Sequence, residues 1–155
     1  GPEVSLTVRA PLAGTVIGIE DVPDPVFAGR IVGPGLALDP ERSEAGVTAL
    51  APVRGTLIKV HPHAFVVVAE DGRAVLVHLG LDTVSLAGAG FTVHAAQGAS
   101  VEAGDPVISF SPDRIEAEGL SPVVPVVALD AEESDLALAP PGTALSPGRT
   151  AFTWA

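Results

Sequence analysis

The 155-residue chain carries 19 acidic and 8 basic side chains, a formal net charge of −11, and no cysteine. A surface of this sign repels phosphate backbones and anionic lipid headgroups, which argues against nucleic acid and membranes as partners and suits docking against basic proteins. The absence of cysteine excludes disulfides, thiolate chemistry and cysteine zinc sites.

The organisation along the chain favours one compact domain. Gly1-Pro2, in a chain without methionine, is typical of a tag-cleavage scar. We therefore expect residues 1–9 to hold a tag remnant and an N-terminal strand, and residues 10–155 to form a single domain. No apolar run approaches the roughly 18–20 residues of a membrane span, and no signal-peptide pattern opens the chain, so we expect a cytoplasmic protein.

Short β-branched runs between turn signals predict a chain of strands. In chain order these are residues 4–8, 15–19, 35–38, 47–50, 56–60, 65–69, 74–78, 91–94, 106–110, 123–129 and 150–154. The 17 glycines and 15 prolines leave room only for short helices, predicted at 25–28 and 112–118, and residues 131–141 are predicted to form a solvated loop. The expected fold is all-β, an antiparallel β-sandwich or barrel with one or two very short helices.

Two pairs of segments echo each other. Residues 10–19, APLAGTVIGI, resemble residues 51–60, APVRGTLIKV, and in both copies a turn leads into a strand. The pattern Gly-x-x-(Val or Leu)-x-x-Gly occurs at 98–104 and again at 142–148. Because each unit occurs only twice, the echoes predict two pseudo-symmetric halves of one sheet assembly rather than a solenoid.

Three of the four histidines lie in one predicted hairpin, residues 61–84. Asp71-Gly72 favours a two-residue type I′ turn. The resulting pairs, which would all project from one face, are Phe65 with His78, His63 with Gly80, and His61 with Asp82. His63 and His78 would then be diagonal neighbours, with Cα atoms about 7–8 Å apart. A three-residue loop would change the parity and place His78 on the opposite face.

Two facing imidazoles could act as a nucleophile and its neighbour, or as metal ligands. Gly80 would leave open space beside His78, through which a partner could approach. On an exposed face, the nearby apolar residues Val26, Phe27, Ile31 and Val32 would form a protein-docking patch. A single histidine beside valines is more often a hydrogen-bonded core residue, which is the alternative from pattern alone.

Four motifs resemble one known family: VPDPVFAGRIVGPG at 22–35, HAF at 63–65, VHLGLDTV at 77–84 and GF at 90–91. They are similar, in order and spacing, to the glucose-type IIA component of the bacterial phosphoenolpyruvate-dependent sugar phosphotransferase system, from about Ala10 to the end. The resemblance implies an antiparallel β-sandwich. It also implies that His78 accepts a phosphoryl group from the phosphocarrier HPr and passes it to a cysteine of the IIB component, while His63 steadies the transferred group.

Further roles follow from this resemblance. It favours Nε2 of His78 as the nucleophile, so we expect the other ring nitrogen to donate to a fixed acceptor such as a backbone carbonyl. Asp82 is expected to orient a basic residue of a partner, because a carboxylate beside a phosphoryl group repels it. The surface for HPr is expected to comprise Val26, Phe27, Ile31, Val32, Gly80, Asp82 and Val84. Regulatory proteins are further expected partners of the unphosphorylated state, whereas the sugar itself is not.

The chain departs from better-known members at His61, where they carry a hydroxyl residue, so a hydroxyl relay is not expected. An N-terminal amphipathic helix is also not expected, and the sequence suits both a free-standing carrier and a domain of a longer permease. No cofactor is expected, although the resemblance allows a zinc ion shared between His63, His78 and a partner's carboxylate.

Two alternatives belong to other classes of protein. A zinc hydrolase could use His61, His63 and His78, although two histidines that flank a proline rarely converge on one metal. A hammerhead-barrel binding module is suggested by the glycine pattern at 98–104. It lacks a lysine at a hairpin tip, because Lys59 is the only lysine in the chain.

Overall fold

The computed structural model describes residues 4–155, and the predicted tag remnant Gly1-Pro2 lies outside them. The strands are β1 (Leu6–Arg9), β2 (Gly14–Gly18), β3 (Gly35–Pro40), β4 (Val47–Leu50), β5 (Gly55–His61), β6 (Ala64–Val68), β7 (Ala74–His78), β8 (Phe91–Val93), β9 (Ser100–Val101), β10 (Pro106–Phe110), β11 (Val124–Ala128), β12 (Leu136–Leu138), β13 (Ala144–Leu145) and β14 (Thr150–Trp154). The helices are α1 (Pro25–Ala28) and α2 (Pro112–Ala117), with short 3₁₀ turns η1 (Ile19–Asp21), η2 (Thr83–Leu86) and η3 (Glu133–Asp135).

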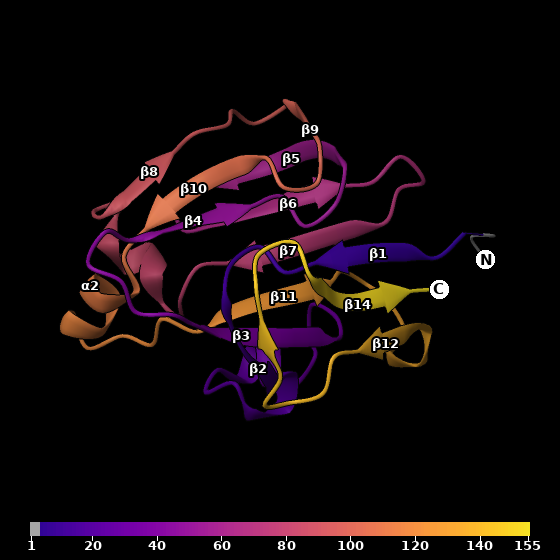
Figure 1. The fold of residues 1–155 in the computed structure, drawn as a ribbon, viewed down its shortest axis with the longest axis horizontal. Coiled ribbons are helices and arrows are strands. Elements are labelled where there is room, and N and C mark those ends of the chain that lie inside the picture. The colour runs from indigo at the N-terminus through magenta and orange to yellow at the C-terminus, as the bar shows by residue number, and fades with distance from the viewer. Residues whose placement is uncertain (1–3) are drawn as a thin grey trace.

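The strands form three antiparallel sheets. The largest has eight strands in the order β13-β2-β3-β11-β7-β6-β5-β9, and two sheets of three strands have the orders β1-β14-β12 and β4-β10-β8. Figure 1 shows β1 beside β14, and the register pairs Leu6 with Trp154. A single hydrophobic cluster joins side chains of all three sheets, among them Leu38, Phe110 and Phe152. The all-β sandwich prediction is confirmed.

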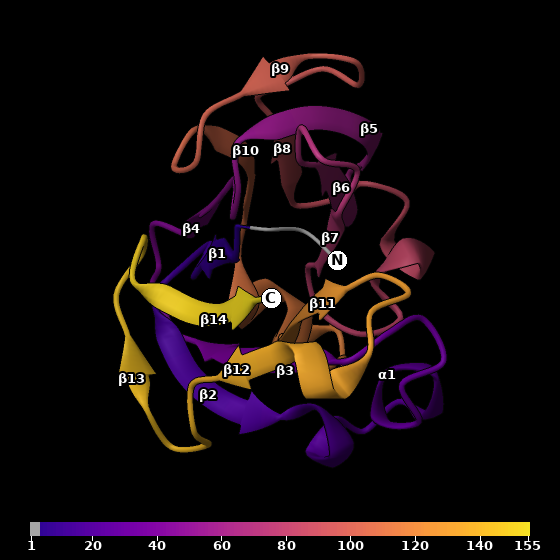
Figure 2. The same ribbon diagram turned by 90° about the vertical axis from the view of Figure 1, so that its right-hand side faces the viewer.

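The echoes in the sequence correspond to two equivalent halves. Four backbone hydrogen bonds come in matching pairs, Arg9 N to Pro52 O with Leu50 N to Pro11 O, and Gly148 N to Ala10 O with Gly104 N to Ala51 O. The strands that follow the two turns, β2 and β5, hold equivalent places, each second from an edge of the large sheet. Figure 2 shows them on opposite sides of the molecule.

The predicted loop at residues 131–141 is wrong, because this segment contains η3 and β12. Strand β12 is short and mostly exposed, and it exists through its ladder with β14, where Leu136 lies opposite Trp154. A strand that is ordered by a distant partner has no local periodicity by which to predict it. The same reason accounts for β9 and β13, which were not predicted either.

A second hydrophobic cluster covers the other face of the large sheet near its centre. It contains Phe27 of α1 and Leu81 of the segment after β7, together with Ile19, Val22, Ala37, Val123 and Val127. Strands β3, β11 and β7 are therefore covered on both faces at this point, and the second cluster lies beneath the end of β7, where His78 is found. Within residues 4–155, no helix is long and apolar enough to cross a membrane.

Candidate functional site

The β6–β7 hairpin closes with a three-residue loop, not with the predicted two-residue turn. The Ala69 amide donates to the Arg73 carbonyl (2.8 Å), the Gly72 amide donates to the Ala69 carbonyl (2.9 Å), and Gly72 has φ +92°. The Asp71 carboxylate accepts from the Arg73 amide (3.1 Å) and pairs with its guanidinium, which stabilises the wider loop. The Asp-Gly pair was therefore correctly identified as a turn but assigned the wrong turn type.

The longer loop shifts the register by one residue. His78 lies opposite Ala64, and Phe65 lies opposite Val77 and is buried in the core. The predicted pairs were Phe65 with His78, His63 with Gly80, and His61 with Asp82. All three are wrong, because the register is displaced by one residue along the whole hairpin. Alternation of side chains then turns Phe65 to the opposite face from His78.

His63 and His78 nevertheless lie together. His63 lies in the turn between β5 and β6, where His61 pairs with Ala64, so its side chain does not follow the alternation of either strand. The His63 carbonyl accepts from the Leu79 amide (2.7 Å), which ties the turn to the end of β7. The ring centroids of His63 and His78 are 5.2 Å apart, with an interplanar angle of 69°. The expectation that a three-residue loop would separate the two histidines is therefore wrong.

The His78 ring is fixed by one hydrogen bond. Nδ1 lies 2.6 Å from the Gly80 carbonyl oxygen. Since a carbonyl oxygen can only accept, Nδ1 carries the proton and Nε2 keeps its lone pair. The expected backbone acceptor is thus present. Burial lowers the pKa of His78, opposed by the bond to Gly80 and by the carboxylates of Asp24 and Asp82, so the ring is neutral at neutral pH.

His63 is also held in its neutral form. Burial lowers the pKa of His63, and the neighbouring imidazoles of His78 and His61 lower it further. The His61 ring stacks on the His63 ring, with centroids 5.7 Å apart and an interplanar angle of 19°. Three imidazoles therefore lie in contact at one end of strands β5–β7.

Gly80 does not leave the open space that was predicted beside His78. Gly80 is buried with φ +84°, and a Cβ there would lie 2.6 Å from Thr83 Cγ2 and 3.1 Å from the Ser121 carbonyl oxygen. Its contribution is a carbonyl aimed at the His78 ring, and it is no part of an exposed partner surface. The turn is held by two further bonds, from Thr83 Oγ1 to the Leu79 carbonyl (2.8 Å) and from the Leu81 amide to the Ser121 carbonyl (2.9 Å).

We expect Gly80→Ala to lower the free energy of unfolding by about 1–3 kcal/mol from backbone strain, and by more where the new methyl group meets Thr83. Gly72→Ala is the matched control, because Gly72 also has a positive φ (+92°), but a Cβ added there would have no atom within 4 Å. Denaturant unfolding of both variants measures the difference. Equal losses would contradict the close packing of Gly80.

The predicted docking residues divide into two groups. Val26, Ile31 and Val84 are exposed by 41%, 71% and 65%. Phe27 is only 6% exposed, and its ring meets the His78 ring edge to face at 5.3 Å, while Val32 packs against the second cluster. Phe27 thus packs against the nucleophile itself, and its assignment to the partner surface stays a prediction.

One acidic residue near His78 was missed. The carboxylate of Asp24 caps α1 by accepting from the Val26 amide (2.9 Å). Its negative charge partly opposes the lowering of the His78 pKa by burial. An aspartate directly before Pro25 is the usual N-cap signature, and it could have indicated this position. Asp82 is exposed, as expected of a residue that meets a partner.

The zinc-hydrolase alternative finds no support in the geometry. Within residues 4–155, no group of three or more histidine and acidic side chains could hold a metal ion. A catalytic zinc site needs about three protein ligands. His63 and His78 alone supply two imidazoles, so any zinc bound there would need ligands from another protein.

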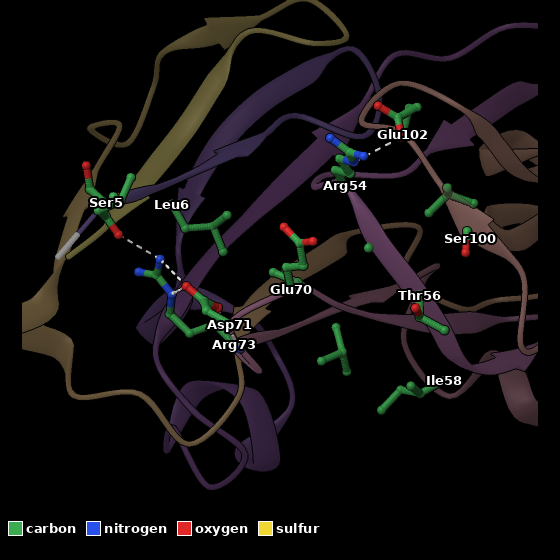
Figure 3. Close-up of a pocket in the computed structure, with 15 residues that line it drawn as sticks. Ser5, Leu6, Arg54, Thr56, Ile58, Glu70, Asp71, Arg73, Ser100 and Glu102 are labelled. Carbon is green, nitrogen blue, oxygen red and sulfur yellow. Dashed lines mark hydrogen bonds and ion pairs between the residues drawn. The ribbon is translucent and has the colours of Figure 1, made fainter. Parts of the chain in front are cut away.

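A broad groove of about 890 Å³ lies apart from the histidines (Figure 3). It is lined by the beginning of β5, the end of β6 and the tip of the β6–β7 hairpin, and the Arg54–Glu102 ion pair (3.2 Å) spans part of it. His61 and His78 lie at the opposite ends of these strands. The groove therefore does not belong to the histidine site.

Comparisons with known proteins agree with this geometry. Residues 6–134 match the family described as phosphoenolpyruvate-dependent sugar phosphotransferase system, EIIA 1. The glucose-specific EIIA component of Bacillus cereus is 38% identical over 146 residues, which cover 93% of this chain and 86% of that protein. The mannose-specific EIIBCA component of Corynebacterium glutamicum is 44% identical over 126 residues, 80% of this chain but 18% of that longer protein. The solved structure of glucose permease IIA from Mycoplasma capricolum superposes with a TM-score of 0.88 at 31% identity, covering 97% of this chain and 96% of that one.

Proposed function

The chain belongs to the EIIA 1 family of the phosphoenolpyruvate-dependent sugar phosphotransferase system. On this premise, we propose that it accepts a phosphoryl group from phospho-HPr on Nε2 of His78 and passes it to a cysteine of a sugar-specific IIB component. One observation supports this most directly, the hydrogen bond of 2.6 Å between Nδ1 of His78 and the Gly80 carbonyl. It leaves the lone pair of Nε2 free on a neutral imidazole, which is the nucleophilic form.

In the acceptance step, the Nε2 lone pair attacks phosphorus while the phosphorus–nitrogen bond to the histidine of HPr breaks. The bonding electrons return to the imidazole of HPr, and Nδ1 of His78 keeps its proton. Positive charge develops on the His78 ring as the new bond forms, and the Gly80 carbonyl stabilises this charge through Nδ1–H. Beyond this, phosphoryl transfer requires in-line positioning and neutralisation of the equatorial oxygens.

His63 is the residue that we assign to the equatorial oxygens. Its ring lies 5.2 Å from that of His78, close enough for an N–H to reach a phosphoryl oxygen. His63 is neutral before transfer because burial lowers its pKa. The arriving negative phosphoryl group favours the protonated ring, so His63 gains charge when there is charge to neutralise.

In the onward step, a cysteine thiolate of IIB attacks phosphorus, and the bond to Nε2 breaks. The phosphoryl group leaves as a thiophosphate ester on IIB, and His78 recovers its neutral ring.

The glucose- and mannose-specific names of the relatives support a hexose such as glucose as the transported sugar. The chain itself would not contact that sugar. Because the Corynebacterium relative carries the matched segment in a longer protein, the same step would also operate within a permease.

Two further roles of the surface around His63 and His78 are part of the proposal. The unphosphorylated protein would bind regulatory targets through the exposed residues around the histidines. If a zinc ion took part, His63 and His78 would supply two of its ligands and a partner's carboxylate another, and the ion would supply binding between the two proteins.

The class of reaction is tested by incubating the protein with phosphoenolpyruvate, enzyme I and HPr, followed by intact mass measurement. We expect one added phosphoryl group that is labile in acid and stable in base, because a phosphorus–nitrogen bond has this behaviour. No added mass, or a group that survives acid, would contradict the proposal.

The docking surface is tested at Ile31, which is 71% exposed. We expect Ile31→Asp to slow transfer from subsaturating HPr about tenfold, because an exposed apolar anchor contributes about 1–2 kcal/mol to such an interface. Ile58→Asp is the matched control, since Ile58 is 46% exposed but lines the groove remote from the histidines. Phe27→Asp is unsuitable, because it would bury a charge. Equal rates for the two isoleucine variants would place the surface elsewhere.

A further inference from the structure

The stacking of His61 on His63 has no part in the mechanism so far. The two rings are nearly parallel, at 19°, and their centroids are 5.7 Å apart, whereas His63 meets His78 edge to face at 69°. His63 is thus in contact with two other imidazoles, of which His78 is the nucleophile. His61 has no assigned task.

His63 differs from its neighbour in how its ring is held. Within residues 4–155, the hydrogen bonds of histidine rings are those of His78 to Gly80 and of His94 to Ser109. The His63 ring has none there, so contacts with other side chains must set its plane. His63 also lies in a turn, where the strand pleat does not fix the direction of its side chain.

His61 offers a firm support for that ring. It is the last residue of β5 and pairs with Ala64 across the turn, so its backbone belongs to the sheet ladder. Pro62 joins the two histidines and restricts the backbone between them, because its φ is fixed. The backbone that carries the His61 ring is thus held by the strand ladder and by Pro62, while the His61 side chain is exposed to solvent.

We propose that His61 is a positioning residue that holds the imidazole plane of His63 by stacking, so that an N–H of His63 is directed at the phosphoryl group on His78. This inference rests on the proposed function and assigns to stacking the support that the ring lacks from hydrogen bonds. The free energy of an aromatic pair of this kind corresponds to a factor of about three to ten in the rate of transfer. The aromatic face of His61 is what matters, not its nitrogens.

The test compares His61→Phe, His61→Ala and His61→Gln in single-turnover transfer from phospho-HPr and onward to a soluble IIB domain. Phenylalanine keeps an aromatic face without nitrogens, whereas glutamine keeps hydrogen-bonding groups without a ring. We expect the alanine and glutamine variants to slow transfer about three- to tenfold, and the phenylalanine variant to keep the wild-type rate within a factor of about two. In a His63→Ala background, the same substitutions should have no further effect, since the residue that they position is gone.

A second readout is independent of phosphoryl transfer. The NMR signals of the His63 ring protons should lose the part of their ring-current shift that comes from His61 in His61→Ala, and should retain such a contribution in His61→Phe. The inference is overturned by wild-type rates in His61→Ala, by equal losses in the alanine and phenylalanine variants, or by an effect that persists without His63. Phosphoryl acceptance by a His78→Ala variant would instead overturn the proposed function and leave the NMR result standing.

Discussion

Replacing His78 by alanine is expected to abolish phosphoryl acceptance from HPr, because the only ring nitrogen with a fixed tautomer and a free lone pair at the site is lost. The fold should persist. The ring is partly buried against Phe27 and His63, so its loss removes only a few packing contacts. We expect a loss of about 1 kcal/mol in the free energy of unfolding, the usual size for one such truncation.

His94→Ala is the matched control for this experiment. His94 is exposed, and its Nε2 lies 2.6 Å from Ser109 Oγ on β10, in one of the three-stranded sheets. This variant should be phosphorylated to full stoichiometry, as judged by intact mass after incubation with phosphoenolpyruvate, enzyme I and HPr. Full phosphorylation of His78→Ala itself would remove His78 from its role.

Replacing His63 by glutamine is expected to separate the two half-reactions. Glutamine keeps an N–H donor for the phosphoryl group that arrives from HPr, but it cannot take up a proton. Onward transfer to the IIB cysteine should suffer more, because there the neighbour of the leaving phosphohistidine must neutralise growing charge. A well-placed charged donor accelerates such a step by a factor of about 10²–10³.

Single-turnover kinetics of both steps, with purified HPr and a soluble IIB domain, measure this division. His94→Gln serves as the control, because it makes the same chemical change at an exposed histidine outside the site. If His63→Gln slowed both steps equally, or neither, then His63 would be a structural neighbour without a charge-dependent role.

The strands could be predicted wherever the signal is local. Apolar β-branched runs between glycines, prolines and acidic turns gave the bounds of β4, β7, β10 and β14 to the residue. The signal for the start of α2 is equally local, since the Ser111 side chain, directly before Pro112, accepts from the Arg114 amide. Strand β12 could not be predicted in this way, because its order depends on β14, which lies farther along the chain.

The residues that form the site were predicted better than the way in which they are arranged. His63 and His78 do meet, but through the turn that contains His63, whereas the predicted register relied on a two-residue turn that the Asp71–Arg73 contacts replace. The burial of Phe27 depends on Leu81 and Val123, which come from segments far along the chain, so an apolar patch could not be told from a support beneath the site. Glycine at position 80 was interpreted as open space, while its positive φ and close neighbours are features of the folded chain.

The most direct test of the account identifies the nitrogen that carries the phosphoryl group. The protein labelled with ¹⁵N on its histidine rings is phosphorylated by HPr, and phosphorus–nitrogen couplings are measured by NMR at basic pH. We expect a single coupling to Nε2 of His78, together with a proton retained on Nδ1 by its bond to the Gly80 carbonyl. Coupling to Nδ1 of His78, or to a nitrogen of His63, would contradict the account.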